Sequence, residues 1–274
     1  MTSVAQYLPE FPPIIAAGVA GCPAWTWIAL SHWPVGMSGD LDLDAVFGRS
    51  SPDDAFAAVL TEARMVLDEI ASPLEAELWG SDILAALGGP TSLAAQAMVP
   101  AAERSGSPEA LAILRVLGAL GWPDLRTTAT RAASRLAARG IPDPVWAAEA
   151  GSPSVGECWR YGDDRGVQEA VTLSFGYAAG RHVVSLLLDH SCGGGIKNVW
   201  VGEAGDVLAR TKDMADEDPS MVFEMITPAV ARAKVERAIA AGECPVQPDE
   251  FSNVASTRAI LRARAALLAR SEIA

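Results

Sequence analysis

The stretch from residue 51 to 140 repeatedly carries the signals with which α-helices begin. Ser51-Pro52-Asp53-Asp54 places a capping hydroxyl, a first-turn proline and two acids at the positive end of a helix dipole. Ser72-Pro73-Leu74-Glu75 adds the glutamate of a capping box. Further starts fall near residues 92, 108 and 123, after which the chain again reads as helix. The segment 51–140 therefore predicts five short helices, packed as an antiparallel bundle or a helical array.

The pattern changes after residues 140–153, which are rich in Pro, Ala and Gly and form the candidate joint between two parts. Residues 158–161, 170–177, 182–188 and 199–201 are rich in β-branched and aromatic side chains and are joined by short connections. This predicts an antiparallel sheet within 157–203. Two helices should follow, one from Thr227-Pro228 to about 239 and one from about 252 to 270. The predicted fold class is α+β, with residues 154–274 as the second domain.

Two charged groups in this second domain are predicted to face water. An acidic loop is predicted before Pro219, formed by Asp213, Asp216, Glu217 and Asp218. Arg258, Arg262 and Arg264 should form the solvated face of the final helix, because charged faces of amphipathic helices usually do.

The first 50 residues form an irregular apolar segment. Prolines at 12, 13, 23 and 34 interrupt its apolar run, which is too broken for a membrane span of about 20 residues. No basic residue precedes Arg49, whereas a secretory signal begins with positive charge. We predict that this segment is buried or covers a groove.

Net charge indicates which classes of partner are unfavourable, and the cysteine pattern indicates the cellular compartment. The formal net charge of −13 disfavours binding to nucleic acid or to anionic membranes across a broad face, although a local basic patch can escape this argument. Cys22, Cys158, Cys192 and Cys244 are scattered and form no Cys-x-x-Cys pair. We therefore expect reduced thiols in a cytoplasmic protein, with no metal ion and no cofactor.

The segment most suited to chemistry runs from His182 to Lys197. An apolar strand there delivers Asp189, His190, Ser191 and Cys192 into three consecutive glycines. The simplest interpretation is a strand that ends in a turn, because turns favour Asp, Ser and Gly. The alternatives are a ligand role for Asp189 and His190, or a nucleophilic Cys192 with a histidine as its base.

The candidate catalytic residues are accordingly His182, Asp189, His190 and Cys192. The glycines Gly193, Gly194 and Gly195 predict positive φ or a surface too close for a β-carbon, and their amides with Lys197 could bind an anion. The chain also holds eight tryptophans, which can fill cores or line an apolar ligand wall.

Four segments of the second domain carry a resemblance: Leu188-Asp189-His190, Gly194 to Lys197, Thr227 to Arg232 and the helix from Arg258 to Leu268. In these segments the chain resembles an uncharacterised actinobacterial protein family. Asn198 stands where the family has Asp, which removes a carboxylate from the turn. The resemblance implies no activity.

Sparse histidines and the lack of a recognised catalytic motif favour a non-catalytic binding or regulatory protein, whose partner is a protein or a small molecule. The alternative is a small-molecule enzyme of a specialised bacterial pathway, with its site near residues 182–197.

Overall fold

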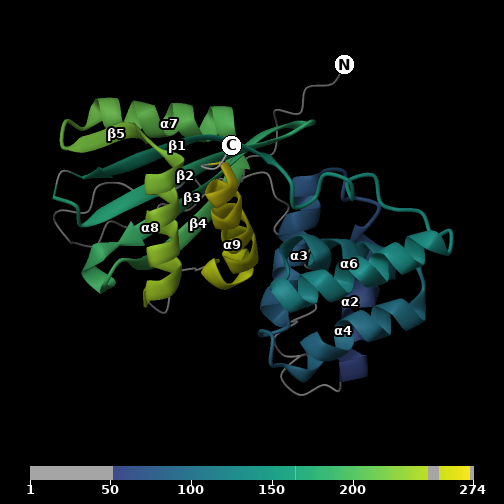
Figure 1. Cartoon of the computed structure of the whole chain (residues 1–274). Helices are drawn as coiled ribbons and strands as arrows, with labels where there is room; N and C mark the ends of the chain where they lie inside the picture. The colour runs from purple at the N-terminus through teal and green to yellow at the C-terminus, as the bar shows by residue number, and fades with distance from the viewer. Residues whose placement is uncertain (1–51, 164, 246–252, 272–274) are drawn as a thin grey trace, which may run out of the picture.

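A computed structural model describes residues 52–163, 165–245 and 253–271, so the predicted segment 1–50 lies outside the described residues. Figure 1 shows a helical part on one side and the sheet with its own helices on the other. The predicted α+β architecture is confirmed: within the described ranges, five helices come first, then a five-stranded antiparallel sheet with C-terminal helices.

The helical part consists of α2 (Pro52–Val66), α3 (Pro73–Ala86), α4 (Leu93–Ser105), α5 (Pro108–Leu120) and α6 (Pro123–Ala138). All five begin where the sequence predicts, each with the start that its local pattern indicates. Ser72 accepts a hydrogen bond from the Glu75 amide, and the Glu75 carboxylate accepts one from the Ser72 amide at 2.9 Å. This is the predicted capping box, and serine caps also begin α4 and α5. Helix α5 is the centre of this part, since Leu111, Leu114 and Leu117 have no exposed surface.

The sheet contains β1 (Ser154–Asp163), β2 (Gln168–Tyr177), β3 (Gly180–Asp189), β4 (Gly195–Glu203) and β5 (Met221–Ile226), in the order β4-β3-β2-β1-β5. The first four strands form the predicted meander, and β5 adds an antiparallel edge to β1. The short 3-10 helix η1 (His190–Cys192) connects β3 to β4.

Helices α7 (Ala204–Glu217), α8 (Pro228–Ala241) and α9 (Val254–Ser271) cover the sheet. The sequence pattern missed β5 and α7. The predicted acidic loop is wrong for Asp213, Asp216 and Glu217, which belong to α7, whereas Asp218 follows the helix as its extended C-cap. The reason is that α7 is amphipathic. Val207 and Thr211, four residues apart, are buried on one face, and the acidic residues lie mainly on the opposite, exposed face.

Helix α9 joins the two parts. In Figure 1 it lies between the sheet and the helical part, and it runs along α3. Leu261, Ala265 and Leu268 belong to the core beneath the sheet, whereas Ala263 belongs to the core of the helical part. One helix therefore contributes apolar side chains to both cores.

Within the described residues, no helix is both long enough and apolar enough to cross a membrane.

Candidate functional site

The four candidate catalytic residues do not all meet in one site, because β3 separates His182 from Asp189, His190 and Cys192. His182 lies near the start of this strand and Asp189 at its end. Seven residue steps at about 3.3 Å each separate their α-carbons by roughly 23 Å. His182 and His190 therefore cannot act on one substrate atom.

His182 is part of a buried polar cluster at the joint between the two parts, the Arg264 cluster, which consists of Glu77, Tyr177, His182 and Arg264. Arg264 donates from Nη2 to Glu77 Oε2 and from Nη1 to Glu77 Oε1 at 3.3 Å, and both residues have no exposed surface. The Tyr177 hydroxyl donates to Glu77 Oε1 at 2.5 Å. Since α3, α9 and the paired ends of β2 and β3 supply these residues, the cluster ties the helical part to the sheet.

The same geometry defines what His182 can do. Burial, followed by the nearby Arg264 charge, lowers the pKa of His182 to about 3. Its Nε2 lies 3.2 Å from Arg264 Nη2, which can only donate, so this nitrogen accepts. The ring also stacks between Phe175 and Tyr177. A neutral, enclosed imidazole with its acceptor occupied is a structural residue.

Arg264 itself corrects the prediction of a solvated arginine face. It is fully buried, and its guanidinium lies 5.0 Å from the centroid of the Phe175 ring. The glutamate that neutralises it is 187 residues away in sequence, so no local pattern marks it. Only the position of Arg264 on the same stripe as Leu261 and Leu268 hinted at burial.

At the other end of β3, Asp189 serves the turn. Its carboxylate accepts from the Ser191 amide at 2.9 Å, from Ser191 Oγ at 2.5 Å and from Gln168 Nε2 at 2.7 Å. Burial opposes ionisation, but the bonds from Ser191 and Gln168 outweigh it and lower the pKa of Asp189. Because these donors use both carboxylate oxygens, the structure supports the simple interpretation of Asp189 as a strand-ending cap.

His190 lies beside a buried carboxylate, Glu169, whose side chain is only 4% exposed. Lys234 Nζ approaches the two Glu169 oxygens at 2.7 and 2.9 Å, and Arg160 Nε lies 2.8 Å away. His190 Nε2 lies 3.1 Å from Glu169 Oε1. Burial disfavours the charged carboxylate, but the hydrogen bonds from Lys234 and Arg160 prevail and lower the pKa of Glu169. Sequence reasoning missed this cluster because its members come from β1, β2, η1 and α8.

The glycine turn confirms both conformational reasons for glycine. Gly193 and Gly194 have φ of 86° and 82°. A β-carbon on Gly195 would lie 2.9 Å from the Gly242 carbonyl oxygen and 3.2 Å from Cys244 Sγ. The amides, however, already have acceptors: Gly193 donates to His190 O at 3.3 Å and Gly194 to Asp189 O at 2.9 Å. An anion would have to displace these bonds. Lys197 acts on the same turn, since its charge helps to lower the pKa of Asp189.

The structure pairs Cys192 with Cys244 in a disulfide, which overturns the expectation that all thiols are reduced. In that state Cys192 has no thiolate with which to attack a substrate. Cys158 is free and buried, and burial raises its pKa to about 11. Cys22 lies outside the described residues.

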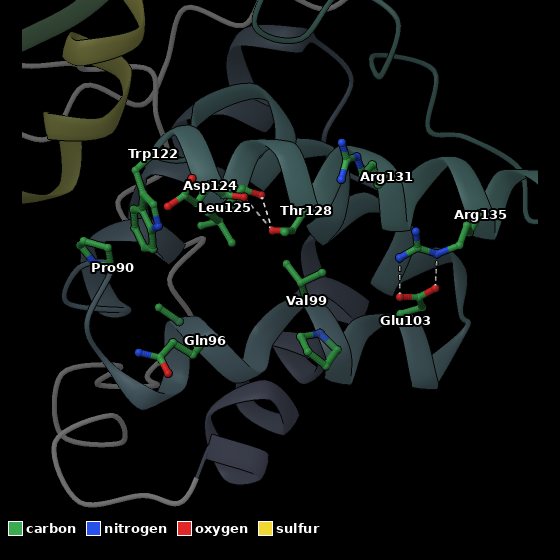
Figure 2. A pocket seen from close by; sticks show the side chains of 12 residues that line it. Pro90, Gln96, Val99, Glu103, Trp122, Asp124, Leu125, Thr128, Arg131 and Arg135 are labelled. Atoms are coloured by element: carbon green, nitrogen blue, oxygen red, sulfur yellow. Dashed lines mark hydrogen bonds and ion pairs between the residues drawn. The ribbon is translucent and has the colours of Figure 1, made fainter.

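A groove of about 540 Å³ lies between α4 and α6, the α4–α6 groove. Ala95, Val99 and Leu125 form its buried apolar floor, and the half-buried Trp122 stands at one end (Figure 2). The full lining is Pro90, Ala95, Gln96, Val99, Pro100, Glu103, Trp122, Asp124, Leu125, Thr128, Arg131 and Arg135. Its rim is exposed, so the groove opens to solvent. Trp79 and Trp146, in contrast, fill the helical core.

The rim of the α4–α6 groove carries two acidic and two basic side chains, Glu103, Asp124, Arg131 and Arg135. At the end away from Trp122, Arg135 holds Glu103 in a paired contact at 2.5 and 2.8 Å, which Figure 2 shows as two dashed lines. This contact lowers the pKa of Glu103. The Thr128 hydroxyl bonds back to Asp124 O and Leu125 O. Asp124 and Arg131 are exposed, and among the described residues neither has an ion-pair partner.

Comparisons with protein-family models, with curated proteins and with solved structures find no match to this chain, so the predicted family resemblance stays a prediction.

Proposed function

We propose that the chain is a non-catalytic binding protein and that its α4–α6 groove receives a segment of a partner protein. The observation that carries this proposal is the groove itself: an open channel with an apolar floor on the surface of a helical array. Grooves between helices are a common place for peptide segments to bind, because apolar side chains of the segment are buried there.

The lining indicates the chemistry of the partner. Val99, Leu125 and Trp122 favour an apolar or aromatic side chain, which would remove their remaining apolar surface from water. Arg131 favours a carboxylate, since it lies seven residues along α6 from the exposed Asp124 and has no ion-pair partner among the described residues, while Arg135 is already neutralised by Glu103. The expected segment therefore carries an apolar anchor next to an acidic residue.

The enzyme alternative has less support. It needs His182, Asp189 or His190 to face a common pocket, but His182 is enclosed at the joint and Asp189 caps a turn. His190 has an exposed edge and lies beside the Glu169 carboxylate, but that carboxylate is already paired with Lys234 and Arg160. We place the protein in the cytoplasm as part of this proposal; in that compartment reducing thiols would act on the Cys192–Cys244 disulfide.

Site-specific photo-crosslinking tests the groove. A photoreactive side chain at Gln96, which is exposed on the rim, should capture a protein from native extract. The same group at Ser134, exposed on α6 but outside the lining, is the matched control. Mass spectrometry then identifies the captured partner and the crosslinked peptide, which should contain an acidic residue beside an apolar one.

Binding of the purified partner is then measured by calorimetry. Arg131→Glu should weaken binding by about tenfold or more, since 1.4 kcal/mol corresponds to a factor of ten. Gln96→Trp should weaken it by filling the groove. Arg210→Glu on α7 makes the same charge change on an exposed residue of the sheet side and should leave binding unchanged. Equal capture at Gln96 and Ser134, or unchanged binding by both groove variants, would exclude the proposal.

A further inference from the structure

We propose that the Cys192–Cys244 pair is a thiol–disulfide exchange site, at which an external thiol reversibly reduces the protein. This site lies in the sheet part, away from the α4–α6 groove, and the inference does not depend on the proposed binding function. It rests on how the two sulfur atoms are exposed and on how the main chain holds them.

The two cysteines differ in access to solvent. Cys192 is exposed at the end of η1, whereas Cys244 is only 5% exposed. An attacking thiolate must approach a disulfide sulfur directly, so access decides which sulfur is attacked. Attack therefore falls on Cys192 Sγ, and Cys244 becomes the leaving thiol and later the resolving thiol.

The main chain keeps the pair together whether or not the sulfurs are bonded. Ile196 donates to Gly242 O at 2.9 Å, and Cys244 donates to Ile196 O at 2.9 Å. Both are main-chain bonds of Ile196 and do not involve sulfur, so they hold the segment 242–244 beside β4 in the oxidised and in the reduced protein. The Cys192 and Cys244 α-carbons lie 5.9 Å apart, within the usual range for a disulfide. The reduced pair stays positioned for reoxidation, because the two thiols meet at a high effective concentration.

The reduced form also has a hydrogen-bond acceptor in place. The Asp189 carbonyl oxygen lies 3.2 Å from Cys192 Sγ and 3.9 Å from Cys244 Sγ. A thiol can donate to this oxygen, whereas a disulfide sulfur has no hydrogen to give. This contact favours the dithiol and makes reduction easier than for a pair in purely apolar surroundings.

The chemistry balances with two equivalents of thiol. The thiolate of the first forms a new S–S bond to Cys192 Sγ, the Cys192–Cys244 bond breaks, and Cys244 leaves as a thiolate that takes up a proton. The second thiol attacks the mixed disulfide, releases Cys192 and leaves as the oxidised partner. The protein gains two electrons and two protons, and the thiols lose them. The reverse sequence reoxidises the pair.

The test equilibrates the full chain in glutathione buffers of graded redox ratio, or with a thioredoxin-type dithiol protein. Free thiols are then blocked by alkylation and each cysteine is quantified by peptide mass spectrometry. Cys192 and Cys244 should become reduced together with a single midpoint, and oxidised glutathione should reverse this. Buried Cys158 is the internal control and should stay unmodified until the protein is denatured. Reduction by both reagents indicates a general thiol site, and reduction by the dithiol alone indicates a protein reductant.

Trapping variants identify the attacked sulfur. Cys244→Ser should accumulate a mixed disulfide with glutathione at Cys192, and Cys192→Ser should accumulate about tenfold less at Cys244, because that sulfur is buried. If either variant fails to fold, alkylation rates of the reduced wild type give the same ordering, with Cys192 faster. The proposal is overturned if neither reagent reduces the pair, if the two cysteines respond at separate midpoints, or if Cys244 reacts as fast as Cys192.

Discussion

Arg264→Met should strongly destabilise the protein, because it removes one charge from a fully buried pair. Methionine keeps most of the length of the side chain but leaves the Glu77 carboxylate without a cation. The Tyr177 hydroxyl and the Gly151 amide, at 2.5 and 2.7 Å, remain as its only donors in the described structure. Removing one partner of a buried ion pair costs about 3–5 kcal/mol, since the remaining charge is uncompensated. Against a typical domain stability of about 5–15 kcal/mol, this is a large fraction.

Urea unfolding followed by tryptophan fluorescence measures this loss. Trp79 and Trp146 report on the helical part, and Trp159 and Trp200 lie on strands of the sheet. Since the Arg264 cluster joins the two parts, the variant should unfold in two separate transitions where the wild type shows one. Arg262→Met, an exposed arginine on the same helix, is the matched control and should change stability by no more than about 0.5 kcal/mol.

The double variant Glu77→Leu with Arg264→Met separates charge from packing. Replacing both members of a buried pair by apolar residues is often neutral, so the double variant should be at least about 2 kcal/mol more stable than Arg264→Met alone. A loss below about 1 kcal/mol for Arg264→Met, or a double variant no more stable than the single one, would refute the view that this pair is held together by mutual charge compensation.

Three further predictions concern residues near the start of β3 and in the glycine turn that follows its end. His182 stays neutral in the folded state down to a pKa of about 3, whereas the unfolded chain takes up a proton near 6.5. Stability should therefore fall as the pH drops below about 6.5, and His182→Gln should flatten that decline in urea titrations at graded pH. Tyr177→Phe should cost about 1–3 kcal/mol by deleting a donor to buried Glu77, with near-wild-type stability as the contrary result. Gly194→Ala, at φ 82°, should lower the free energy of unfolding by about 1 kcal/mol or more. Gly166→Asn, at φ 69° in the β1–β2 turn, should lower it less, because Asn tolerates positive φ better than Ala does. Equal decreases of stability in thermal melts would contradict this conformational argument.

Local signals in the sequence were sufficient for the elements they govern directly. The helix starts at Ser72 and Ser107 depend on a capping side chain and a proline a residue away, so they could be read from the chain itself. The conformation of the Gly193–Gly195 turn was predictable for the same reason. Strand β5 was not, because it is a short, mostly exposed edge strand whose place depends on pairing with β1 some 60 residues earlier.

The sites depended on contacts between distant residues, which is why the sequence misplaced them. Cys192 pairs with Cys244 across 52 residues, and Arg264 pairs with Glu77 across 187. The α4–α6 groove arises between two helices that are not consecutive in the chain. Each feature is set by how the elements pack, and no periodicity or motif within one element records that arrangement.

The position of α9 has a consequence for how the chain is made. Helix α3 leaves the ribosome long before α9, since the segment from Ala86 to Val254 is synthesised between them. Until then Glu77 lacks its cation, and the side of α3 that α9 will cover stays open to water. The helical part therefore stays incompletely packed during translation until α9 has been made. We expect chaperones and proteases to recognise nascent chains that stop before Val254.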